Sequence, residues 1–187
     1  MSAAEAGNYS VAGTLKGGAA VTVRAIRPDD RRRLGEAFGK LEAGSVYTRF
    51  FSHRGQPSDE ELRAAVEVDF ESTVALMVTV PDGKGDETII GAGRYLLHGP
   101  AGAGGGAEVA FTVEEDYHGR GIAGMLLGHL ARIARSQGVP ELTAEVLPGN
   151  RGMLKVLARS GLPMRQSTED GVVHVALSLD RDEPQGG

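Results

Sequence analysis

The sequence predicts a mixed α/β domain of the α+β kind, with a central sheet and helices packed against it. Segments that alternate between apolar and polar residues, as strands do, are interspersed with segments of helical spacing. Three of the expected strands follow one another without a helix between them, which argues against a doubly wound parallel sheet. The chain has 187 residues, which suits one domain, because two would each be too small for a substantial core.

Seven strands and four helices are expected, in the order β-α-α-β-β-β-α-β-α-β-β, which makes a mixed and mostly antiparallel sheet. The longest helix carries Ile122, Leu126 and Leu130 on one face and ends at Gly138. The strands are expected at residues 20–26, 73–80, 88–97, 107–113, 142–147, 163–168 and 172–179. The helices are expected at residues 28–44, 58–70, 119–137 and 150–160.

Both ends of the chain are expected to be flexible tails around one domain at residues 20–180. Residues 1–19 are rich in Ala, Gly and Ser and have no periodicity, and residues 181–187 look frayed. The N-terminus does not read as a secretory signal, and no apolar run approaches the ~20 residues needed to cross a bilayer. These features predict a cytoplasmic protein without a membrane partner.

The composition excludes several kinds of chemistry. Cysteine is absent, which excludes disulfides, thiolate metal sites and a cysteine nucleophile. A net charge of −5 argues against broad nucleic-acid binding, which needs clustered Lys and Arg. His53, His98 and His174 are scattered without metal-ligand spacing, so we expect no metal.

The loop at residues 117–124 carries the strongest functional signal, because glycines stand between an expected strand and the long helix. Glycines let the backbone approach an anion closely, and the free N–H groups and dipole of the helix then hold it. Arg120 adds a charge able to reach a phosphate. The loop also spells GxGxxG, the fingerprint of dinucleotide-binding oxidoreductases, but too little chain follows for the rest of such a domain. A purely structural alternative is close helix packing, which fits Gly124 and Gly128.

This loop resembles the signature of the GNAT superfamily of N-acetyltransferases, Gln/Arg-x-x-Gly-x-Gly/Ala. Residues 118–123 match it except at the first position, where His118 stands. The order of expected elements around the loop, Asn150 after the next strand and the closing hairpin are also similar, so that the resemblance covers about residues 21–179. It implies the GNAT fold and transfer of an acetyl group from acetyl-CoA to an amine.

Four further segments resemble the acetyltransferase domain of bacterial Pat-type protein-lysine acetyltransferases. This resemblance favours a protein lysine as the acceptor, with a small-molecule amine as the alternative. The segments are Arg27-Pro28-x-Asp30, Arg49-Phe50-Phe51, Glu67-Val68-Asp69-Phe70 and Ala107-Glu108-Val109-Ala110-Phe111.

The resemblance also assigns roles to single residues. A lysine ammonium, with a pKa of ~10.4, needs a base before it can attack a thioester, and Glu108 is the candidate. The alternative for Glu108 is a strand residue that faces solvent. Asn150 caps a helix, and in related enzymes this Asn also contacts the cofactor. The expected cofactor-binding residues are Phe111, Thr112 and Val113 for the pantetheine arm, His118, Gly119, Arg120, Gly121, Ile122, Ala123 and Gly124 for the pyrophosphate, and Asn150.

Four questions stay open in the sequence. Many GNAT enzymes carry a Tyr in the helix after Asn150 that protonates the CoA thiolate, and residues 153–158 contain none. Another group or water would then supply this proton. Tyr47, Arg49 and Phe51 either line the acceptor entrance or form a buried helix edge. The chain could also be a CoA-binding sensor that has lost catalysis, and its oligomeric state is undetermined.

Overall fold

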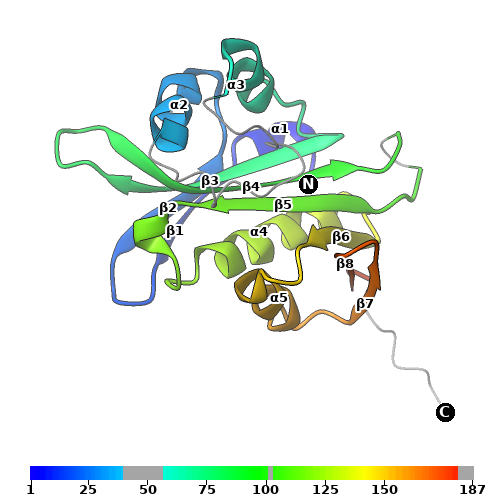
Figure 1. Ribbon diagram of the computed structural model, residues 1–187. Coiled ribbons are helices and arrows are strands. Elements are labelled where there is room, and N and C mark those ends of the chain that lie inside the picture. Colours follow the sequence, from blue (N-terminus) through cyan, green and yellow to red (C-terminus); the bar gives the residue numbers. More distant parts are fainter. Residues whose placement is uncertain (40–56, 101–102, 181–187) are drawn as a thin grey trace.

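The computed structural model describes residues 1–39, 57–100 and 103–180 (Figure 1). Within these residues eight strands form one sheet in the order β1-β2-β3-β4-β5-β6-β8-β7. The strands are β1 Ser10–Thr14, β2 Ala20–Ala25, β3 Thr73–Pro81, β4 Glu87–Leu97, β5 Ala107–Val113, β6 Glu141–Val146, β7 Met164–Glu169 and β8 Val172–Ser178. The helices are α1 Ala3–Gly7, α2 Arg31–Gly39, α3 Asp59–Val66, α4 Ile122–Ser136 and α5 Arg151–Ala158.

The expected α+β class and its mixed, mostly antiparallel sheet are confirmed. Every neighbouring pair of strands is antiparallel except β5 and β6. Helices α2 and α3 cover one face of the sheet, and α4 and α5 cover the other (Figure 1). Strand β3 is buried on both faces, because Val74, Leu76 and Val78 join the core below α4 while Ala75 and Met77 pack under α2 and α3.

The N-terminal segment is the main correction to the sequence analysis. Residues 1–19 were expected to be a flexible tail, but they form α1 and β1, which raises the counts to eight strands and five helices. A capping box of Ser2 and Glu5 starts α1. Strand β1 pairs with β2 from Ser10↔Arg24 to Thr14↔Ala20, and both counts refer to the described residues. The segment folds because it buries Ala6 and Leu15 in the main core.

Two helix boundaries also differ from expectation, each for a local reason. Helix α3 ends at Val66, since Asp69 accepts backbone hydrogen bonds from the three residues Glu71, Ser72 and Thr73 and so stabilises a turn. Helix α4 begins at Ile122 and not at 119. The expected tail at 181–187 lies outside the described residues. None of the described helices is long and apolar enough to span a membrane.

The junction between β5 and β6 positions the functional site. These parallel strands pair at Ala107↔Leu142 and Glu108↔Thr143, near the start of β5. On its other side, β5 is paired with β4 as far as Gly91↔Val113. The second half of β5 therefore has a backbone edge towards β6 that the sheet ladder does not use, and a wedge opens between the two strands.

Candidate functional site

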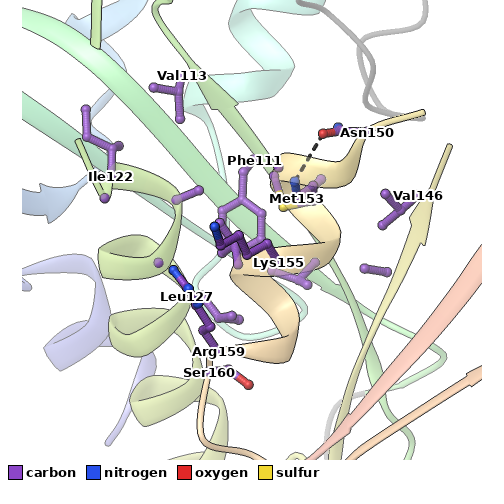
Figure 2. Close-up of a pocket in the computed structure, with 18 of the residues that line it drawn as sticks. Phe111, Val113, Ile122, Leu127, Val146, Asn150, Met153, Lys155, Arg159 and Ser160 are labelled. Atoms are coloured by element: carbon purple, nitrogen blue, oxygen red, sulfur yellow. Dashed lines mark hydrogen bonds between the residues drawn. The ribbon is translucent and has the colours of Figure 1, made fainter. Parts of the chain in front are cut away.

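A cleft of about 1400 Å³ occupies this wedge. The second half of β5, the loop at residues 117–121, the near faces of α4 and α5 and the end of β6 line it (Figure 2). Small-molecule pockets usually measure about 300–1,000 Å³. The cleft is thus large enough for a nucleotide joined to an extended arm.

The loop before α4 presents a helix N-terminus to this cleft. Gly119 and Gly121 have φ values of 75° and 88°, which explains why glycine stands at both positions and why α4 starts only after them. Gly121 is the N-cap of α4 and has no side chain to cap the first turn, and that turn contains no acidic residue. The backbone N–H groups and the positive end of the helix dipole are therefore suited to an anion.

The glycines within α4 leave room above the helix and do not serve packing. A Cβ atom placed on Gly124 or Gly128 would meet no atom within 4 Å, and both residues line the cleft. The packing alternative is wrong for these two residues. Two glycines in β4 allow close packing instead. A Cβ atom on Gly91 would lie 2.6 Å from Ile122 Cγ2, and one on Gly93 would lie 2.9 Å from Phe111 Cδ1.

Positive charge gathers around the cleft although the whole chain is acidic. Five of its described lining residues are Lys or Arg, against two carboxylates, Glu108 and Glu145. Lys155 of α5 and Arg159, which directly follows this helix, extend into the same space as Phe111 (Figure 2). Such a surface favours a ligand that carries phosphates. The five are Lys16, Arg132, Arg135, Lys155 and Arg159.

Strand β5 divides its side chains between the two faces of the sheet. Val109 and Phe111 are buried in the core with α4, whereas Glu108, Ala110 and Thr112 alternate with them. The unpaired edge of Phe111–Val113 is able to hydrogen-bond an extended ligand as an added strand would. His118 Nε2 donates to the backbone carbonyl of Val113 over 2.9 Å and so ties the loop to the end of this strand.

Glu108 lies at the inner end of the wedge and is half-buried. It lines the cleft and also a second cavity of about 470 Å³, to which His98, Thr143 and His174 contribute. Ala144 and Glu145 are the other residues common to the two cavities. The two spaces therefore meet at the start of the wedge, with two carboxylates at the junction.

Arg94 is a charged neighbour of Glu108. Arg94 pairs with Ala110 and Leu96 pairs with Glu108, so Arg94 and Glu108 are diagonal neighbours on one face of the sheet. Burial lowers the pKa of the Arg94 guanidinium, and the carboxylate of Glu108 opposes that shift. The sequence analysis did not single out Arg94, because only the strand register brings it next to Glu108.

The structure brings nearly all the expected site residues together. Glu108, Asn150 and the expected residues of 111–113 and 118–124 line the cleft, with the exception of Arg120. Arg120 is exposed, and its guanidinium lies 5.0 Å from the ring centroid of Tyr117. Asn150 Oδ1 accepts a hydrogen bond from Met153 N over 3.1 Å, which confirms its helix cap (Figure 2). Tyr47, Arg49 and Phe51 lie outside the described residues.

Lys16 is a lining residue that sequence reasoning missed. It lies in the turn between β1 and β2, inside the segment expected to be a tail. The pair Gly17-Gly18 was an available signal, since two adjacent glycines are typical of a hairpin turn. No pattern in the sequence places that hairpin beside the loop before α4, because the contact arises from tertiary packing.

Comparison with known proteins identifies the family. The Acetyltransferase (GNAT) family matches residues 44–162. The chain is 34% identical over 139 residues to the acetyltransferase Pat of Mycolicibacterium smegmatis, covering 74% of this chain and 40% of that protein. It is 26% identical over 163 residues to an acetyltransferase of Pseudomonas aeruginosa, covering 86% of each chain. The fold matches the crystal structure of the GNAT domain of S. lividans PAT with a TM-score of 0.79 and 35% identity, over 90% of this chain and 96% of that one.

The glycine-rich loop at residues 117–124 lies inside the segment that matches the GNAT family, residues 44–162. This match excludes the dinucleotide-binding oxidoreductase as an alternative. The fold, the wedge beside β5 and the cationic cleft agree with a site for a phosphorylated acyl donor. The chain therefore belongs to the GNAT family of acetyltransferases, enzymes that take the acyl group from acetyl-CoA.

Proposed function

We propose that this protein acetylates a lysine side chain of another protein and that Glu108 is the general base. The position of Glu108 carries the proposal, because this carboxylate lines both the large cleft and the second cavity. An acceptor amine entering from the second cavity would meet the thioester of a donor in the cleft at this junction.

The donor is assigned to the cleft by its shape and charge. The diphosphate of acetyl-CoA lies against the N–H groups of residues 118–124, where the helix dipole and the glycines accommodate it. The pantetheine arm extends along the free edge of Phe111–Val113, and Asn150 borders its far side. This arrangement directs the acetyl group towards Glu108, at the closed end of the wedge.

The reaction then needs two protons removed from the acceptor nitrogen and one returned to the sulfur of CoA. Glu108, directly or through water, takes a proton from the acceptor ammonium, and the neutral nitrogen attacks the thioester carbonyl carbon. The nitrogen of the tetrahedral intermediate loses its second proton to water, the C–S bond breaks to leave the neutral amide, and CoA leaves as the thiolate. In the helix that carries a Tyr in many relatives, Leu157 is fully buried and Lys155 and Val156 line the cleft. Because a thiol has a pKa of ~8.5, water suffices to protonate the thiolate.

The second cavity supports an amine as the acceptor. Glu108 and Glu145 supply negative charge there, with His174 Nδ1 3.8 Å from Glu145 Oε1. Arg165 also lines the cavity, but its guanidinium is paired with Glu141. Every residue of β7, which borders the cavity, is exposed. An open border of this kind supports a lysine on a protein surface over a small amine that must be enclosed.

The test compares the Glu108→Gln variant with the wild type by CoA thiol release in the presence of a panel of lysine-containing proteins and peptides. Loss of the base should lower kcat/KM by about 10²- to 10⁴-fold and leave the Kd for acetyl-CoA within about twofold. Glu145→Gln is the matched control, since it removes the other carboxylate at the junction. We expect a smaller loss from it.

Three outcomes would contradict parts of this proposal. Equal losses in both variants would remove the distinction that singles out Glu108. Acetyl-CoA binding without thiol release across the panel would instead indicate a non-catalytic CoA sensor. Faster turnover with small amines than with any protein would reassign the acceptor and leave the base in place.

A further inference from the structure

The N-terminal segment runs along the whole length of α4. The N-terminal amino group donates to Ser136 O over 3.3 Å, at the C-terminal end of the helix. Tyr9 Oη lies 2.6 Å from His129 Nδ1, near its middle. Further on, a Cβ atom on Gly13 would lie 3.4 Å from Met125 Sδ. Lys16 N donates to Arg120 O over 3.3 Å, in the loop before the helix. The segment is therefore antiparallel to α4 and ends at the glycine-rich loop.

The turn that follows β1 is held in one conformation. Leu15 is 3% exposed and anchors the turn in the main core. Leu15 N donates to Ala19 O over 2.9 Å, and Gly18 N donates to Leu15 O over 3.0 Å. Gly17 and Gly18 have φ values of 100° and 90°, so this tight turn requires glycine at both positions. The backbone of Lys16 is thus fixed between a buried residue and the loop.

The side chain of Lys16 lies across the N-cap of α4. A Cβ atom on Gly121 would have Lys16 Cε at 3.6 Å and Lys16 Cδ at 3.9 Å as neighbours. Lys16 is exposed and lines the cleft on the side of the loop. Its ammonium therefore belongs to the same end of the cleft as the N–H groups of the first turn of α4.

We propose that Lys16 binds the diphosphate of acetyl-CoA and that the N-terminal segment is a structural part of the donor site. The inference rests on the placement of the diphosphate at residues 118–124 proposed above. The loop offers backbone N–H groups and a partial positive charge, and Lys16 adds a full charge opposite them. A diphosphate held on two sides in this way would join the N-terminal segment to the start of α4.

The experiment measures acetyl-CoA binding by calorimetry and steady-state kinetics with two donors, acetyl-CoA and S-acetyl-pantetheine, which lacks the diphosphate. Lys16→Met should raise the Kd and KM for acetyl-CoA about tenfold, the effect of one charge-assisted hydrogen bond, with kcat within about twofold. The KM for S-acetyl-pantetheine should not change. Lys16→Arg should restore most of the affinity, because it restores the charge.

Lys84→Met is the matched control, since Lys84 is also an exposed lysine in a glycine-containing turn but does not line the cleft. An unchanged Kd in Lys16→Met, or an equal effect on both donors, would overturn the inference.

Gly124→Ala tests separately whether the diphosphate binds at residues 118–124, because the added methyl group narrows the cleft at the first turns of α4. If Gly124→Ala weakens acetyl-CoA binding and Lys16→Met does not, the loop assignment stands and the role of Lys16 is wrong. If neither variant affects binding, the diphosphate lies elsewhere and both are wrong.

Discussion

At the scale of single residues, a buried ion pair gives a structural reason for Arg27-Pro28-x-Asp30, one of the four segments that resemble Pat-type acetyltransferases. Arg24 and Asp30 are 2% and 0% exposed, and Arg24 Nη1 and Nη2 donate to the two carboxylate oxygens of Asp30 at 2.7 and 2.6 Å. Asp30 also accepts from Arg27 N over 2.8 Å, and Glu87 pairs with the same guanidinium. The segment Arg27-Pro28-x-Asp30 therefore closes β2 onto the turn before α2.

We expect Asp30→Asn to lower the free energy of unfolding by about 3–5 kcal/mol, because the buried guanidinium of Arg24 loses the carboxylate that balances its charge. The double variant Arg24→Met/Asp30→Leu should recover part of this stability, since it removes both buried charges and leaves only the partly exposed Glu87 without this partner. Urea unfolding measures the effect. Asp29→Asn, an exposed neighbour, is the control and should stay within about 0.5 kcal/mol of the wild type. A loss below about 1 kcal/mol in Asp30→Asn would show that the pair is not needed.

The same pair determines how stability responds to acid. Burial favours the neutral acid, but the hydrogen bonds from Arg24 and Arg27 N–H outweigh it and hold the pKa of Asp30 below its usual 3.8. The ionised carboxylate thus stabilises the fold above pH 3.8, and this contribution is lost as the pH falls through the lower pKa of the folded state. The unfolding profile of Asp30→Asn should be flatter than that of the wild type in this acidic range.

At the scale of elements, the distance between α4 and the sheet depends on where the glycines are. Gly91 and Gly93 in β4 let Ile122 and Phe111 approach the strand, so that the loop before α4 reaches the wedge. Gly128 lies on the opposite surface of the helix, where a side chain would extend into the cleft. Gly91 and Gly93 therefore allow close packing within the protein, whereas Gly128 leaves space for a ligand.

Substitution to alanine should separate these two roles. Gly91→Ala places a Cβ atom 2.6 Å from Ile122 Cγ2, so we expect a loss of about 1–3 kcal/mol in unfolding free energy and a higher KM for acetyl-CoA. Gly128→Ala should instead raise the unfolding free energy by about 0.5–1 kcal/mol, because alanine is the better helix former and no atom lies within 4 Å. Thermal unfolding and donor KM values measure both effects. Destabilisation by Gly128→Ala would mean that this glycine is needed for packing after all.

The sequence predicted those elements whose own pattern determines them. Periodic apolar residues marked α4, a β-branched apolar run marked β3, and clustered glycines marked the anion loop, where the structure gives Gly119 and Gly121 positive φ values. Strand β1 was missed because none of its residues is buried, so it carries no apolar stripe. The attachment of this segment to α4 depends on contacts such as Tyr9 with His129, which are 120 residues apart in the chain. For the same reason the sequence indicated Glu108 but not Lys16 or Arg94, whose places follow from packing and strand register.

At the scale of the whole molecule, the distribution of charge matters more than its sum. The chain has a net charge of −5, yet the cleft beside β5 has five cationic lining residues among those described. A cationic cleft in a chain of negative net charge attracts a phosphorylated ligand to that one place. Charges that are exposed to solvent in this way are screened by salt, with a Debye length of about 10 Å at 0.1 M and about 3 Å at 1 M.

The affinity for a donor should therefore depend on ionic strength only if the donor carries phosphates. Raising NaCl from about 0.05 M to about 0.5 M should increase the KM for acetyl-CoA several-fold, because screening weakens attraction between the cleft and the phosphates. The KM for S-acetyl-pantetheine, which carries no phosphate, should stay nearly constant. Lys155→Met in α5 and Arg159→Met at the end of this helix (Figure 2) should each reduce the salt dependence for acetyl-CoA, because both residues line the cleft. Equal salt dependence for the two donors would mean that the cationic lining does not bind the phosphates, and the affinity for acetyl-CoA would then have to come from the backbone of the loop and the edge of β5.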